Sequence, residues 1–182
     1  PKHIAGVICG ICFVVMLPGF MIIQPNNSRV LTFFGRYAGT VISNGFYWVN
    51  PLFLKSTVTL RILNLNIDPI KVNDKVGNPI MIGAVVVWGI KDTYKASFDI
   101  SGNIREFVQI QSDAALRQVA GMYAYDTNET IDKVTLRSDE SGEITQRLED
   151  ELNSRLAIAG IEIVEARINY LAYASEIASV ML

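Results

Sequence analysis

The 182-residue chain has few of the side chains that most enzymes and metal proteins use for chemistry. It contains one histidine, His3, and two cysteines. A single imidazole argues against histidine-rich metal sites and histidine-based catalysis. Two cysteines exclude a disulfide-dense secreted scaffold. The net charge of −2 argues against a nucleic-acid-binding protein, which would show a strongly basic face.

Catalytic sequence motifs are also missing. The chain has no G-x-S-x-G, P-loop or G-x-G-x-x-G sequence. Asp74, Asp92 and Asp99 are scattered carboxylates near lysines, and we predict that they are solvated loop residues. We therefore predict no catalytic, metal-binding or cofactor-binding residues, no cofactor and no enzyme activity.

A charge-free apolar run lies near the N-terminus. Ile4 to Ile23 are all apolar apart from three glycines and Pro18. Twenty helical residues extend about 30 Å, the thickness of the hydrocarbon core of a bilayer. This predicts a transmembrane anchor over residues 1–23, with a signal peptide or a buried helix as alternatives. We expect Pro18-Gly19 to end or kink the helix near its last turn, and we expect residues upstream of Pro1.

The charges are segregated along the chain. Every acidic residue lies at or after Asp68, whereas residues 24–67 carry the bases Arg29, Arg36, Lys55 and Arg61. A basic stretch beside an apolar anchor favours contact with anionic headgroups, and it favours the cytoplasmic side of the membrane. Chance placement in a small sheet domain is the alternative.

An aromatic cluster lies within this basic stretch. Aromatic rings at a membrane surface settle at the depth of the headgroups. The predicted membrane-contact residues are Phe46, Tyr47, Trp48, Phe53, Arg29 and Arg36. In the alternative interpretation, half of the aromatic residues fill a sheet core. Strand alternation would then place Phe46 and Trp48 on one side and Tyr47 on the other.

Strand signals dominate residues 24–91 and helical spacing follows. A one-residue slip in the alternation of residues 55–67 predicts a bulge or bend in a long strand, and residues 80–90 read as a strand buried on both faces. The other predicted strands are 29–34, 46–49, 70–73 and 161–168, and the predicted helices are 103–121, 138–159 and one from about Tyr173. We expect Gly160 to end the second helix and the last helix to continue beyond Leu182.

The helix predicted at 138–159 carries opposite charges at i,i+4 spacing. The pairs are Glu143–Arg147, Arg147–Glu151 and Glu151–Arg155. Their alternating signs suit lateral pairing of identical copies, so we predict that these four residues form an oligomer contact. A solvated helix face is the alternative, and it is the default interpretation for the acidic run Glu149-Asp150-Glu151.

These elements predict an α+β chain with four parts. The parts are a transmembrane anchor (1–23), a β-rich membrane-proximal subdomain (24–91), an α+β subdomain (92–171) and the start of a long assembly helix (172–182).

Three segments in this order resemble the stomatin/prohibitin/flotillin family, whose domain is known as SPFH or band 7. The first is Asn44-Gly-Phe-Tyr-Trp-Val-Asn-Pro51. The second is Lys71 to Trp88, followed by Ile90-Lys-Asp92. The third comprises Ser112 to Arg117, then Arg137, then Leu156 to Ala174. The stretch from Val164 to Ala178 looks especially like bacterial members.

The resemblance implies an SPFH1-like and an SPFH2-like subdomain leading into a coiled-coil helix. It implies a single-pass scaffold of the cell (inner) membrane that assembles with copies of itself into rings or cages and organises membrane microdomains. The alternative is a regulatory partner of a membrane protease or another membrane protein complex. The partners expected are the lipid bilayer, further copies of the chain and such a membrane protein, with no nucleic acid.

Overall fold

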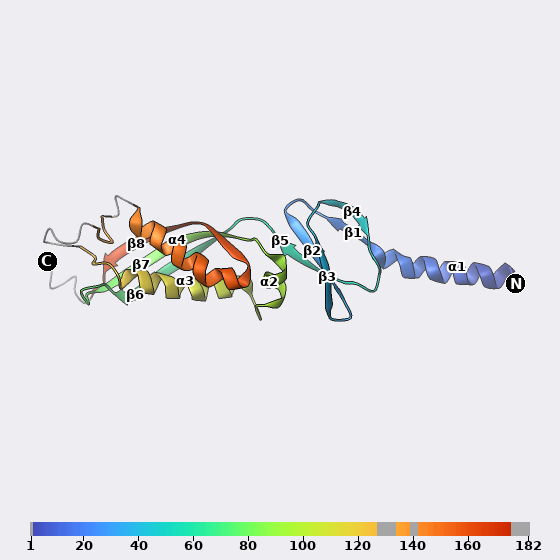
Figure 1. Cartoon of the computed structure of the whole chain (residues 1–182), viewed down its shortest axis with the longest axis horizontal. Coiled ribbons are helices and arrows are strands. Elements are labelled where there is room, and N and C mark those ends of the chain that lie inside the picture. Colours follow the sequence, from blue (N-terminus) through green and yellow to red (C-terminus); the bar gives the residue numbers. More distant parts are fainter. Residues whose placement is uncertain (1, 127–133, 139–141, 176–182) are drawn as a thin grey trace. The chain divides into compact units, whose positions relative to one another are not determined.

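The computed structural model of the chain describes residues 2–126, 134–138 and 142–175. It is an α+β structure, as predicted, and it divides into two compact units, residues 1–61 and 62–182. Figure 1 shows their helices and strands in chain order. The division falls before the predicted boundary at residue 91, because β6 and β7 (bounds below) belong to the second unit.

The apolar N-terminal run forms three elements. Helix α1 spans Lys2–Met16, the 3-10 turn η1 spans Leu17–Gly19, and strand β1 spans Phe20–Ile23. Proline lacks the N–H that would continue a helix, so the prediction that Pro18-Gly19 ends the helix is confirmed. The predicted single helix over 1–23 is not found. Among the described residues, none of the helices combines the length and apolar character needed to cross a membrane.

The first unit contains two small antiparallel sheets. In one, β1 pairs with β4 (Gly45–Trp48). In the other, β2 (Asn27–Phe33) lies between β3 (Arg36–Val41) and β5 (Leu54–Thr59). Their shared core is small, so this unit depends on few buried apolar contacts. Its members are Met21, Ile23 and Leu31, with Val41, Tyr47, Val49 and Phe53 partly buried against them.

Three contacts attach the last residue of α1 and the turn η1 to β4, β5 and the residue after β4 in the same unit. The Trp48 Nε1–H donates to the Met16 carbonyl at 3.2 Å. The Lys55 ammonium donates to the Pro18 carbonyl, and the Val49 N–H donates to the Gly19 carbonyl at 2.9 Å. The last carbonyls of a helix have no partner within the helix. The sheets supply these partners, and we call the three bonds the helix-end contacts.

The second unit is built on a three-stranded antiparallel sheet in the order β6-β7-β8. The strands span Leu63–Asn73, Pro79–Ile90 and Ile161–Tyr173. The strand predicted over 55–67 is divided between β5 and β6. Strand β6 then continues to Asn73 across a register shift between Ile67 and Ile70. Pro69 lies in that shift, where its missing N–H breaks no regular ladder bond.

Two helices cover one face of this sheet, α3 (Ile104–Ala120) and α4 (Glu143–Leu156), as Figure 1 shows. The predicted apolar series of α4 is confirmed, because Ile144, Leu148, Leu152 and Leu156 are all fully buried. The shorter α2 (Thr93–Phe98) follows β7, and the turn η2 (Ala157–Ala159) follows α4.

Strand β7 alternates rather than being buried on both faces. Ile82, Val86 and Trp88 are fully buried, whereas Met81 and Val87 are half-buried. The prediction of burial on both faces is therefore wrong for one face, because the helices cover only the other.

The start of α4 also differs from the prediction. Gly142, at φ 69°, precedes the helix without a side-chain cap, and Ser138 instead pairs with Thr135 in an isolated bridge. The helix predicted from Tyr173 falls largely on residues 176–182, outside the described residues, and Tyr173 itself ends β8.

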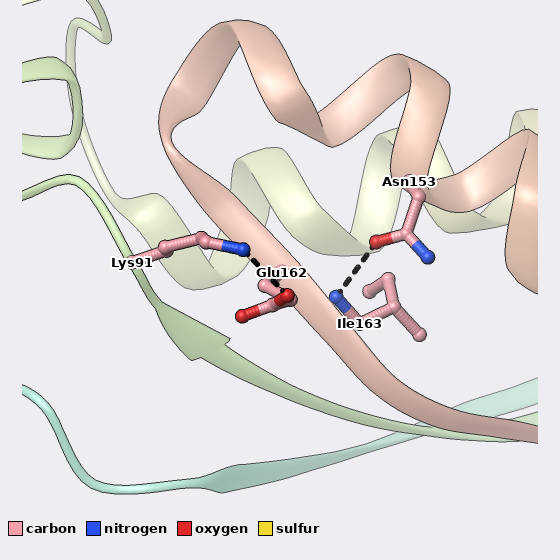
Figure 2. Close-up of polar contacts among 4 residues, drawn as sticks. All are labelled: Lys91, Asn153, Glu162 and Ile163. Atoms are coloured by element: carbon pink, nitrogen blue, oxygen red, sulfur yellow. Dashed lines mark hydrogen bonds and ion pairs between the residues drawn. The ribbon is translucent and has the colours of Figure 1, made fainter.

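Side chains of α4 hold β8 on both sides of one of the two register shifts in its pairing with β7, the shift between Val87 and Trp88. The Ile163 N–H donates to Asn153 Oδ1 at 3.0 Å, and the Ala166 N–H donates to Glu149 Oε1 at 3.0 Å. Figure 2 shows the first of these bonds beside the ion pair of Lys91 and Glu162, 2.8 Å long. Glu149 is therefore not a solvated member of an acidic face, because it satisfies a strand amide.

Asp74, predicted to be solvated, is 5% exposed in the turn between β6 and β7. Its Oδ1 accepts from the Val76 and Asn78 N–H groups, and its Oδ2 accepts from the Asn78 amide and the Tyr125 N–H. Burial raises the pKa of this carboxyl, but the four hydrogen bonds outweigh burial and hold the pKa below the ordinary value of 3.8.

The other two aspartates of that prediction differ from Asp74. Asp92 caps α2 by accepting from the Tyr94 and Lys95 N–H groups. Asp99, the residue after α2, is exposed, as predicted. Only Asp99 therefore fits the description of a solvated loop residue.

Candidate functional site

Strands β1 and β4 present an exposed apolar surface directly after α1. The register places Phe20 opposite Trp48 and Ile22 opposite Phe46, so these four side chains share one face. They are 48%, 49%, 65% and 67% exposed, respectively. Phe20 and Phe46 stack with ring centroids 5.3 Å apart. We call these four residues the apolar face.

The predicted aromatic cluster is divided by strand alternation. Phe46 and Trp48 lie on the apolar face, whereas Tyr47 points to the opposite side and packs on the core of the first unit. Phe53 also packs on that core and meets Phe33 edge to face at 5.3 Å. Of the four predicted aromatic contacts, the structure thus brings two together on an exposed surface, and the other two have packing roles.

A groove of about 760 Å³ lies beside the apolar face in the same unit. Arg29 and Lys55 line it, and so do Phe20, Ile22 and Phe46 of the apolar face. Gln24, Asn27 and Thr57 add polar groups to its wall. We call it the cationic groove. Arg36, predicted together with Arg29, is exposed at the start of β3 and does not line the groove.

No carboxylate side chain exists within the first unit. The first acidic residue of the chain is Asp68, and the unit ends at Arg61. Arg29, half-buried in the central strand β2, therefore has no acidic partner in its own unit. A guanidinium carries five N–H donors, so Arg29 can donate to an anion in the groove without competition from an acidic side chain of its unit.

Sequence reasoning does not identify Phe20 and Ile22 as members of this site, and it includes Lys55 only as part of the predicted basic stretch. The predicted anchor includes Phe20 and Ile22, and the signal that could separate them from it is Pro18-Gly19, after which the chain continues as a strand. Lys55 joins the groove only because β5 pairs with β2, with Lys55 opposite Leu31.

The predicted oligomer contact on α4 is partly engaged within the chain. Arg155 forms an ion pair with Glu151 at 2.7 Å and donates to Gln118 Oε1 of α3 at 2.7 Å. The Glu143–Arg147 and Arg147–Glu151 pairs are not among the ion pairs of the described residues. Glu143 accepts from the Tyr123 hydroxyl at 3.5 Å, and Arg147 is exposed.

Fold and site together define an α+β protein. Its first unit presents the apolar face beside the cationic groove, directly after an apolar helix. The model of the SPFH domain / Band 7 family matches residues 21–181, and the chain belongs to this family. The family is generally associated with membranes. A search among curated proteins gave no match.

Proposed function

We propose that the protein is a membrane-anchored scaffold whose first unit lies against the bilayer and whose copies assemble side by side. The single observation that carries the proposal is the apolar face at the end of α1. An exposed patch of large apolar side chains marks a surface that contacts a membrane or another protein.

Helix α1 supports insertion into lipid. Described side chains around the whole helix are exposed, and the helix carries no charge after His3. A helix that is apolar on all sides needs an apolar environment. Its fifteen residues extend about 22 Å, most of the hydrocarbon thickness. The bases of the first unit favour the cytoplasmic side of the cell membrane.

The apolar face then lies at the depth of the headgroups. The helix-end contacts join α1 and η1 to β4 and β5, so an inserted α1 holds Phe46 and Trp48 close to the membrane surface. Tryptophan is favoured at that depth because its amphipathic ring suits both lipid and water, and phenylalanine is typical of the lipid-facing side of interfacial elements.

Trp48 can report this depth directly. We expect lipids brominated high on the acyl chain to quench Trp48 fluorescence in vesicles containing the whole chain, and deeply brominated lipids to quench it less. The chain has two tryptophans, and Trp88 is 2% exposed in the core of the second unit. The difference in fluorescence between the wild-type chain and Trp48→Phe is therefore the signal of Trp48.

The Trp48→Phe chain also serves as the matched control, because Trp88 alone should show little quenching. Equal quenching of Trp48 at every depth, or none at all, would contradict the placement of the apolar face at the membrane surface.

Assembly is proposed to use the exposed side of α4. Arg147→Glu should lower high-mass cross-linked species in membranes several-fold, and adding Glu143→Arg should restore them if the two side chains pair between copies. Arg105→Glu, an equal charge change on α3, should leave the distribution unchanged. A wild-type chain that stays monomeric in membranes would refute the scaffold.

The same cross-linked sample separates the scaffold from a regulatory partner. A homo-oligomer alone supports the scaffold. A second membrane protein present in fixed ratio would replace that proposal with the regulatory one.

A further inference from the structure

We propose that the cationic groove binds the phosphate of an anionic membrane phospholipid, whose acyl chains lie along the apolar face. This inference rests on the proposed position of the first unit at the membrane and adds the class of lipid that the unit selects. Arg29 and Lys55 of the groove would bind the phosphate. Phe20, Ile22 and Phe46 line the groove beside them and would contact the acyl chains.

The two cations are held by the fold rather than placed on flexible loops. Arg29 lies in β2, paired with Val41 on one side and Thr57 on the other. Lys55 lies in β5. The Lys55 ammonium is held through one of its donors by the Pro18 carbonyl. An ammonium has three donors, so two remain for an anion.

The charge of the unit suits an anionic ligand. Arg29 and Lys55 have no carboxylate in residues 1–61 to neutralise them, so an incoming phosphate meets no competing acid of the unit. Arginine matches the geometry of phosphate oxygens with paired N–H donors, and lysine adds a point charge.

The occupant is amphipathic because the walls of the groove are. Phe20, Ile22 and Phe46 belong both to the groove and to the apolar face, so the cations and the apolar surface are continuous. A phospholipid matches this arrangement, because its anionic headgroup is followed by apolar chains. An acidic protein segment would use the cations but would leave the apolar face without a partner.

The test uses the whole chain in vesicles of equal parts phosphatidylglycerol and phosphatidylcholine, with only one of the two lipids brominated in each sample. Brominated phosphatidylglycerol should quench Trp48 more strongly than brominated phosphatidylcholine, because anionic lipid gathers at the groove. Each charge-assisted hydrogen bond to the phosphate changes lipid affinity about tenfold or more. Arg29→Gln with Lys55→Gln should therefore lower the preference at least about tenfold.

The matched control is Arg36→Gln with Arg61→Gln, which removes the same charge from the same unit at residues outside the groove. This control should keep the preference. Equal loss in both double variants would overturn the groove in favour of general surface charge. An unchanged preference in the Arg29/Lys55 variant would also overturn it, and would assign these cations to a partner such as an acidic protein segment.

Failure of the groove and failure of the proposed function give different results. If the first unit does not lie at the membrane, neither brominated lipid quenches Trp48. If only the groove is wrong, both lipids quench Trp48, and the Arg29/Lys55 variant behaves either as the wild type or as the Arg36/Arg61 variant.

Discussion

Asp74→Ala is expected to destabilise the second unit by about 3 kcal/mol, because it removes an ionised acceptor from several N–H groups at once. The loss includes the bond from Tyr125, which ties the segment after α3 to the β6–β7 turn. Urea unfolding of the chain in mild detergent measures the effect. A Trp48→Phe background leaves Trp88 fluorescence to report on the second unit alone.

The pH dependence tests the role of the charge. The pKa of Asp74 is lowered in the folded chain, so its stabilisation is complete above the ordinary pKa and is lost as the pH falls through the folded pKa. The wild type should thus lose stability below about pH 4. Asp74→Asn should remove this part of the loss, because an amide does not titrate.

Asp74→Asn also places an amide donor near the donors of Tyr125 and Asn78. Its stability near neutral pH should therefore fall between wild type and Asp74→Ala. Identical acid profiles for wild type and Asp74→Asn would show that Asp74 does not carry the effect.

Gly160→Ala is expected to cost about 3 kcal/mol or more, for two separate reasons. Gly160 has φ 67°, a left-handed conformation that costs an alanine about 1 kcal/mol. A Cβ there would also lie 2.6 Å from the Asp92 carbonyl oxygen and 2.7 Å from Asp92 Cβ. Relief of that overlap must displace backbone, because the Gly160 carbonyl accepts from the N–H groups of Lys91 and Asp92.

Gly142→Ala is the matched control. Gly142 has φ 69°, and a Cβ there meets nothing within 4 Å among the described residues. It should cost only the conformational part, about 1 kcal/mol. Chemical unfolding of both variants in the same Trp48→Phe background compares them directly. Equal losses would mean that the contact with Asp92 is relieved without cost.

Periodic burial was predictable from sequence and long-range contact was not. Leu148 and Leu152 revealed α4 because helix spacing is local. The burial of Asp74 depends on Tyr125, 51 residues further along the chain. No local pattern could distinguish this carboxylate from the solvated Asp99.

The candidate site likewise has features that local sequence patterns predict and features that depend on long-range contact. Alternation at β4 predicted that Phe46 and Trp48 would share a side, and the segregation of charge pointed to the first unit. The groove itself requires β5 to pair with β2, and it requires residues 20–23 to leave the helix and pair with β4. Hydropathy favours one continuous helix there, because it measures apolar character and not the direction of the backbone after Pro18.

The helix-end contacts have a mechanical consequence. Met16 of α1 and Pro18 and Gly19 of η1 are held by side-chain and backbone donors of β4, β5 and the residue after β4, so a tilt of α1 is expected to be transmitted to these strands. If α1 is inserted as proposed, a change in bilayer thickness or curvature that tilts α1 is expected to shift the β1–β4 sheet as well. Trp48→Phe removes one of the three attachments while keeping an aromatic ring, and it should loosen this coupling between lipid packing and the orientation of the sheet.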